Sequence, residues 1–181
     1  AELKTLSLDV MKSSADVANY NTEFRALQQQ LHSITTETFN GVSLFASTTV
    51  AGGAMTFGTN KHTVSVFTSD RGAAGSIVSL NKSALAAALT FTSTTDASNA
   101  ATGSGITIAA ATSSAAINIS DITVSFFTKA LENIATLRAE NGATMTRLQF
   151  AEDHLRLSAS NLEAANSRIM DVDVATESTA L

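Results

Sequence analysis

The sequence predicts a mainly α-helical protein with a β-rich portion: an antiparallel rod of long helices, packed like a coiled coil, with a β-hairpin and a small β-rich central insertion. Apolar residues follow a helical spacing near both ends of the chain. The stretch between them is rich in Ser, Thr, Ala and Gly. This order divides the chain into residues 1–69 (first part of the rod plus the hairpin), 70–121 (the insertion) and 122–181 (the long helix that completes the rod).

Residues 1–37 carry an amphipathic helical pattern. Apolar side chains recur three and four positions apart, at Leu3, Leu6, Val10, Val17, Tyr20, Phe24, Leu27, Leu31 and Ile34. The polar run from Ser13 to Asp16 interrupts the pattern, and an Asp side chain can accept a hydrogen bond from the first turn of a following helix. We therefore expect two helices, the second capped by Asp16.

A turn and short strands are expected after the second helix. The dipeptide Asn40-Gly41 tolerates positive φ, so the chain can reverse its direction there. Residues 55–58 and 63–67 have the composition of short strands and predict a hairpin around the turn at 59–62.

The insertion has the weakest pattern in the chain. Residues 83–89 predict a helical turn or two, and residues 106–108 and 117–119 alternate like edge strands. Asp121 is the expected N-cap of a long helix that starts near Ile122.

The segment from Leu131 to Glu177 predicts one long helix with apolar residues on two faces. Apolar residues recur at multiples of seven, interrupted only by Asn141, at Ile134, Leu148, Leu155, Leu162 and Ile169. The opposite face carries Ala143, Phe150, Leu157 and Ala164. An apolar back face is unusual beside solvent. Another helix of the same subunit or terminal segments outside this chain could cover it, or Phe150 and Leu157 contact a neighbouring subunit.

Two blocks of the sequence resemble bacterial flagellins. The run Leu-Arg-Ala-Glu-Asn-Gly-Ala at 137–143 and the closing Ser-Arg-Ile-x-Asp-x-Asp-x-Ala-x-Glu at 167–177 strongly resemble the family's C-terminal core. The segment 16–24 looks like the second helix of the N-terminal core, and Phe39-Asn40-Gly41 matches the turn that follows it.

The resemblance covers residues 16–67 and 126–178 and implies a structural subunit of the bacterial flagellar filament, which polymerises through its helical core and terminal segments for cell motility. It implies that residues 70–121 are a small variable segment that faces outward. It also implies an extracellular protein, secreted without a cleaved signal peptide, whose partners are further copies of itself, an export chaperone, and cap and junction proteins.

The ends of the sequence predict a trimmed chain. It starts at Ala1 without Met and stops just after a family motif, so we expect a core fragment that lacks the terminal polymerisation segments and is monomeric. Two alternatives to the filament subunit stay open: a hook–filament junction protein, and a cell-surface glycan-binding or adhesive flagellin homologue.

Two arginines of the long helix are further candidates for contacts between subunits. Arg138 lies in another row of the inner seam, with Leu131, Met145 and Ala159, and polar groups in a seam can fix helix register. We expect Arg138 and Arg168 to donate ion pairs to a neighbouring subunit. Glu152 and Arg156, four residues apart, predict a well-oriented ion pair within the helix.

A carboxylate cluster closes the motif region. Asp171, Asp173 and Glu177 carry oxygen ligands of the kind that hard cations prefer, but the EF-hand pattern with its Gly does not accompany them. A charged contact between or within subunits is therefore favoured over a cation site or a solvated helix end.

Composition argues against several other classes of function. The net charge is −5 and the 11 basic residues are scattered, whereas nucleic-acid binding needs a concentrated basic surface. The chain holds no apolar run long enough to span a membrane and no Cys. The histidines, His32, His62 and His154, have no metal-ligand spacing, and no nucleophile or phosphate-binding motif occurs. We therefore expect no enzyme activity and no cofactor.

Overall fold

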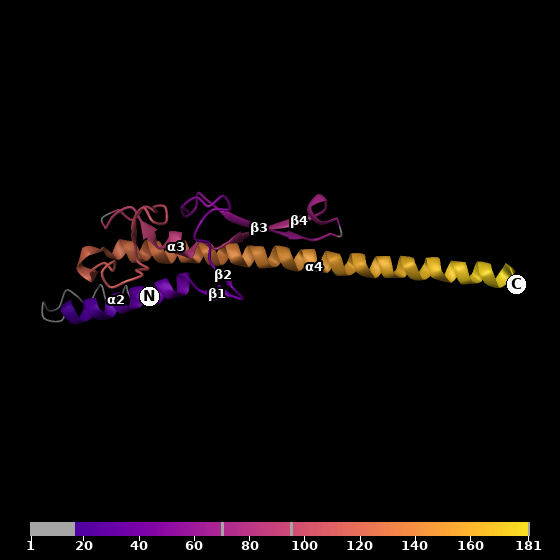
Figure 1. Ribbon diagram of the computed structural model, residues 1–181, viewed down its shortest axis with the longest axis horizontal. Coiled ribbons are helices and arrows are strands. Elements are labelled where there is room, and N and C mark those ends of the chain that lie inside the picture. Colours follow the sequence, from indigo (N-terminus) through magenta and orange to yellow (C-terminus); the bar gives the residue numbers. More distant parts are fainter. Residues whose placement is uncertain (1–16, 70, 95, 181) are drawn as a thin grey trace. The chain divides into compact units, whose positions relative to one another are not determined.

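The computed structural model describes residues 17–69, 71–94 and 96–180, with side chains described up to Met170 and at Ser178. In chain order, the elements are α2 (Val17–Thr35), β1 (Thr38–Phe39), β2 (Val42–Ser43), β3 (His62–Phe67), η1 (Gly72–Ala74), β4 (Ile77–Lys82), α3 (Leu85–Ala88), β5 (Thr90–Phe91), β6 (Ile106–Thr107), η2 (Ile119–Asp121) and α4 (Val124–Ala180) (Figure 1). The predicted fold class is confirmed: a long C-terminal helix, a shorter N-terminal helix and small β-sheets.

Contacts within the chain divide it into two compact units. The first contains the described residues up to Val64 together with Asn81–Asn141, and the second contains Ser65–Leu80 and the residues from Gly142 onward. Helix α4 and the β3–β4 sheet each contain residues of both units. The division into three segments made from the sequence stays a prediction. It assigns a role to each segment, whereas the two units are defined by contacts within the chain.

Helix α2 begins directly after the predicted cap position and buries one side. Phe24, Gln28 and Thr35 are its buried residues, spaced four and seven apart. The helix expected before it, and Asp16 itself, lie outside the described residues.

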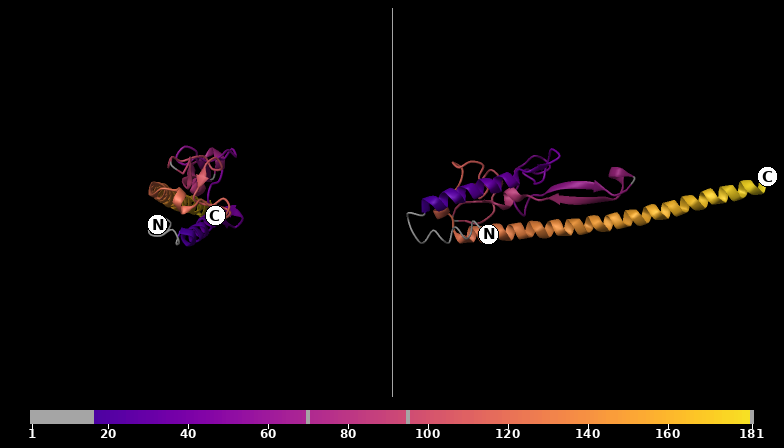
Figure 2. Two further views of the ribbon diagram at one scale, coloured as in Figure 1. Left: turned by 90° about the vertical axis from the view of Figure 1, so that its left-hand side faces the viewer. Right: turned by 90° about the horizontal axis from the view of Figure 1, so that it is seen from below.

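Helices α2 and α4 run in the same direction, not in opposite directions as predicted for the long helices of the rod. Figure 1 and the right-hand view of Figure 2 show α2 beside the first part of α4 with their N-terminal ends together. Phe24 of α2 meets Phe127, in the first turns of α4. The physical reason is the long connection: the chain leaves α2, passes through the strands and the insertion, and returns beside the start of α2 before α4 begins.

The core of the first unit is built from α2, the insertion and the start of α4. Its buried residues are Phe24, Leu89, Phe91, Ile108, Ala109, Ile119, Ile122, Phe126, Phe127 and Ala130. A smaller cluster holds Ala46, Met55, Ala84 and Ala87. Residues 85–122 thus contribute much of the buried surface, although their composition is rich in small and polar residues.

The predicted hairpin is wrong in the strands that it pairs. Residues 62–67 form a strand, but β3 pairs with β4 and not with residues 55–58. Met55 instead has a buried side chain in the smaller cluster, and Thr56 forms an isolated bridge with Ala101. Burial of Met55 among residues distant in the sequence therefore outweighs the tendency of residues 59–62 to form a hairpin turn.

The insertion follows its predicted pattern in part. Helix α3 lies where a helical turn was expected, and β6 pairs antiparallel with β5 in the register Thr90↔Thr107. Residues 117–119 form no strand, because side chains of α2 bind their backbone. Thr123, not Asp121, precedes α4, since residues Ile119–Asp121 form the short 3-10 helix η2.

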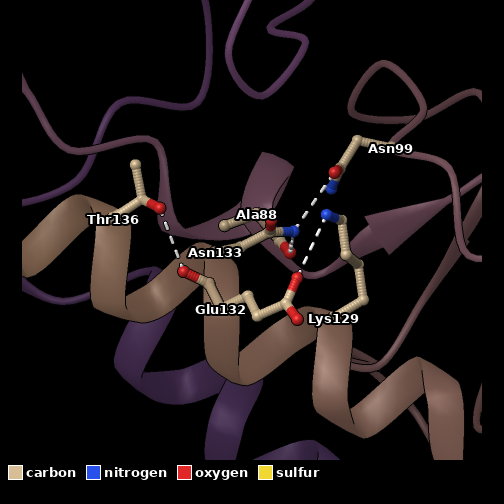
Figure 3. Close-up of polar contacts among 6 residues, drawn as sticks. All are labelled: Ala88, Asn99, Lys129, Glu132, Asn133 and Thr136. Carbon is tan, nitrogen blue, oxygen red and sulfur yellow. Dashed lines mark hydrogen bonds and ion pairs between the residues drawn. The ribbon is translucent and has the colours of Figure 1, made fainter.

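A buried asparagine ties α4 to the insertion. Asn133 is 3% exposed, and its side-chain Nδ2 donates to the Ala88 carbonyl at 2.9 Å and to Asn99 Oδ1 at 3.2 Å (Figure 3). One turn away on the exposed side, Lys129 and Glu132 form an ion pair at 3.2 Å. Burial of the amide with both bonds formed fixes how α3 and the loop at Asn99 sit on α4.

Candidate assembly surface

The C-terminal part of α4, residues 142–170, presents large apolar side chains to solvent. The helix spans 57 residues and contains no Pro, so nothing in its sequence interrupts the backbone hydrogen-bond ladder. Its exposed large apolar residues beyond Asn141 are Met145, Phe150, Leu155, Leu157, Leu162, Ile169 and Met170. Scattered apolar surface residues are ordinary, but several along one helix make it a candidate interaction surface.

The row at multiples of seven changes its environment along the helix. Ile134 packs against the core of the first unit, and Leu148 is half-buried. Leu162 and Ile169 are each 69% exposed. The same spacing that seats α4 in the core at its start therefore leaves an open apolar row toward its C-terminal end.

The opposite face is equally open. Phe150 is 69% exposed and Leu157 is 62% exposed, so no described segment of the chain covers them. Their contact with a neighbouring subunit stays a prediction. We name the exposed residues of both rows, Phe150, Leu155, Leu157, Leu162 and Ile169, the α4 apolar surface.

A second apolar site surrounds the predicted turn. Strands β1 and β2 pair in the register Phe39↔Val42 and leave Asn40-Gly41 as a two-residue connection, with φ values of 50° and 76°. Both residues lie in the left-handed region that Asn and Gly tolerate. Phe39 and Val42 are 75% and 66% exposed.

The charged candidates are only partly described. Arg138 and Arg168 are exposed side chains of α4. Asp171, Asp173 and Glu177 belong to the helix, but their side chains lie outside the described set. Whether these residues pair between subunits stays a prediction.

The predicted ion pair within α4 is confirmed. Arg156 Nη2 donates to Glu152 Oε1 at 2.7 Å, four residues away. Both side chains are largely exposed, so the pair adds only about 0.3 kcal/mol to helix stability. It supports the helix without covering the α4 apolar surface.

Three polar residues of α2 were missed by sequence reasoning. Gln28 is fully buried, accepts a hydrogen bond from the Ile117 backbone N–H at 3.2 Å and donates to the Ile117 carbonyl at 2.9 Å. Asn21 accepts from the Ile119 N–H, and Arg25 donates to Asn118 Oδ1. Their spacing of four and three residues beside the apolar row was the available signal.

The described residues also bear on metal, membrane and pocket sites. Within the described part of the chain, no group of three or more His, Asp or Glu side chains could hold a metal ion. The described helices include none long and apolar enough to cross a membrane. A depression in the first unit is lined mainly by small and hydroxyl residues such as Thr35, Thr90 and Thr102, and the described lining includes no carboxylate or large aromatic side chain.

Comparison with known proteins points to one family. Residues 124–181 match the bacterial flagellin C-terminal helical region. Over 48 residues the chain is 46% identical to "Putative flagellin YvzB" of Bacillus subtilis (strain 168), a match that covers 26% of this chain and 30% of that relative's length. No solved structure matches. The C-terminal part of the chain is therefore similar to flagellins.

Proposed function

We propose that this chain is a structural subunit of the bacterial flagellar filament, which polymerises through its helical core for cell motility. The observation that carries the proposal is the α4 apolar surface, which lies within the residues that match the flagellin C-terminal helical region. Burying apolar side chains in water-free contacts yields about 25 cal/mol per Å². Contact with further copies of the chain would supply that burial along the helix.

The proposal extends to location and partners. A filament subunit is extracellular and reaches the filament through the flagellar export route without a cleaved signal peptide. Its partners are then other subunits, an export chaperone, and cap and junction proteins. The role is structural rather than enzymatic, and Arg138, Arg168, Asp171, Asp173 and Glu177 are proposed to form charged contacts at or near subunit interfaces.

Electron microscopy of seeded assembly tests this proposal. The natural protein is mixed with short flagellar filaments from the same bacterium, and filament length is measured over time. We expect elongation from the seeds. Folded protein that leaves the seeds unchanged would contradict the filament role and favour the junction protein or the surface-binding homologue.

A double substitution tests the surface itself. Phe150→Ser with Leu157→Ser should abolish elongation while the melting temperature stays within a few degrees, because both side chains are exposed. Gln149→Ser with Asn161→Ser is the matched control, since it changes two exposed polar residues of the same helix to the same residue. A large fall in melting temperature for the first pair alone would instead place Phe150 and Leu157 in the core of the subunit.

A further inference from the structure

The dipeptide Asn-Gly occurs twice in the chain, in two different backbone settings. Asn40-Gly41 forms the turn between β1 and β2, whereas Asn141-Gly142 lies inside α4. Both asparagines are exposed, so solvent contact does not distinguish them. Asn-Gly is the dipeptide most prone to spontaneous deamidation, because Gly has no side chain to hinder attack by its own backbone nitrogen.

We propose that Asn40 is a self-modification site that converts to aspartate and isoaspartate, and that Asn141 is protected. The reaction needs no enzyme. The Gly41 backbone nitrogen loses its proton and attacks Asn40 Cγ, which forms a C–N bond; the Cγ–Nδ2 bond then breaks and ammonia leaves. Water opens the resulting succinimide at either carbonyl. The net change is addition of one water and loss of one ammonia, with no oxidation or reduction.

The turn at Asn40-Gly41 leaves the reacting atoms free. An added side-chain carbon at Gly41 would meet no atom within 4 Å, so the turn has open space beside this residue, as Gly142 also has. Among the described residues the Gly41 N–H donates no backbone hydrogen bond. The flanking strands are two residues long, so the turn can open locally at low cost and reach the geometry that attack requires.

The second dipeptide is held by helical geometry. In the interior of α4 the Gly142 N–H is bonded to the carbonyl four residues earlier. Asn141 Oδ1 also accepts a hydrogen bond from Ser83 Oγ at 3.0 Å. Attack on Asn141 would first need several turns of α4 and this side-chain contact to open.

Modification of Asn40 would change the exposed apolar turn. Aspartate adds a negative charge between Phe39 and Val42, and isoaspartate adds a methylene group to the main chain. A two-residue connection sets the strand register, so the longer main chain cannot keep the Phe39↔Val42 pairing. This consequence holds whether or not the chain forms filaments.

Peptide mapping by mass spectrometry tests the proposal. The full chain is incubated in mildly alkaline buffer, both folded and in denaturant, and deamidation at Asn40 and Asn141 is measured over time. An isoaspartate-specific methyltransferase with labelled methyl donor identifies the iso product. Both sites should react at similar rates in denaturant, because both have the same Asn-Gly dipeptide and neither is then held by folded structure.

In the folded chain we expect Asn40 to react at least about tenfold faster than Asn141, since loop opening costs far less than helix opening. Equal deamidation rates at Asn40 and Asn141 in the folded chain would overturn the proposal. Asn40→Asp is the companion variant: it should remove the fast phase while the slow signal at Asn141 stays. A fast phase that persists in this variant would also overturn it.

Discussion

Phe24 and Phe127 meet edge to face, with ring centroids 6.0 Å apart and an interplanar angle of 82°. They come from α2 and α4, and both are buried. An edge-to-face pair adds about 0.5–1.5 kcal/mol to the stability gained from burial alone. This contact fixes α2 beside the start of α4 and explains why the two helices share one core although they are far apart in the sequence.

Phe24→Ala should destabilise the fold by about 3–5 kcal/mol, because it leaves a cavity in the core and removes the aromatic pair. Chemical denaturation followed by circular dichroism measures the free energy of unfolding. Phe150→Ala is the matched control: the same change at an exposed site of α4 should cost less than about 1 kcal/mol. Equal losses for the two variants would contradict the assigned core.

Asn133→Ala should lower the free energy of unfolding by about 1–3 kcal/mol, since the Ala88 carbonyl and Asn99 Oδ1 lose their buried donor. Asn161→Ala, at an exposed position of the same helix, should have little effect. The same denaturation measurement compares them. A neutral Asn133→Ala would mean that water replaces the amide without loss.

The helices could be predicted because their signal is local. Residues three and four apart on one helix face share one environment, so the apolar spacing alone located α2 and α4. The sheets could be predicted less well, because strand pairing joins distant segments. The sequence predicts a strand over residues 63–67, but it predicts pairing with the nearer segment 55–58 and not with β4.

The insertion shows a second limit of sequence reasoning. Residues 117–119 alternate like a strand, yet Gln28 binds the Ile117 backbone through both polar ends of its amide. Here a polar side chain takes the hydrogen bonds that a neighbouring strand would take. The bound segment carries no periodic pattern that would reveal this. The apolar rows of α4 were predictable, whereas their exposure depends on which other segments reach them.

The pKa of the Asp96 carboxyl lies below its ordinary value. The Ser98 hydroxyl is the main cause, and the Ser98 backbone N–H, 2.9 Å from Asp96 Oδ1, is the second. A depressed pKa stabilises the fold above the ordinary pKa of Asp, and this contribution is lost as the pH falls through the folded value. The effect on stability is small, because the group is fully exposed.

Ser98→Ala should therefore raise the pKa of Asp96 toward the ordinary value for Asp, while Ser98→Thr, which keeps a hydroxyl, should preserve the lowered pKa. A pH titration of the Asp96 carboxyl carbon by nuclear magnetic resonance measures both. The same pKa in the two variants would show that the backbone N–H alone lowers it.

Gly142→Ala should stabilise the fold by about 1 kcal/mol, because Ala has the higher helix propensity. Gly142 lies in the interior of α4, its φ is not positive, and an added side-chain carbon would meet no atom within 4 Å. Nothing in its described surroundings therefore requires Gly. Chemical denaturation of the full chain measures the gain.

Gly41→Ala is the informative counterpart. Gly41 has the same open space as Gly142, but its φ is positive. Its φ of 76° is strained for any residue with a side-chain carbon, so the same substitution should destabilise the turn by about 1 kcal/mol. Opposite signs for the two substitutions would show that backbone conformation decides the outcome. A loss of stability from Gly142→Ala would mean that α4 bends or is covered closely at this residue in solution.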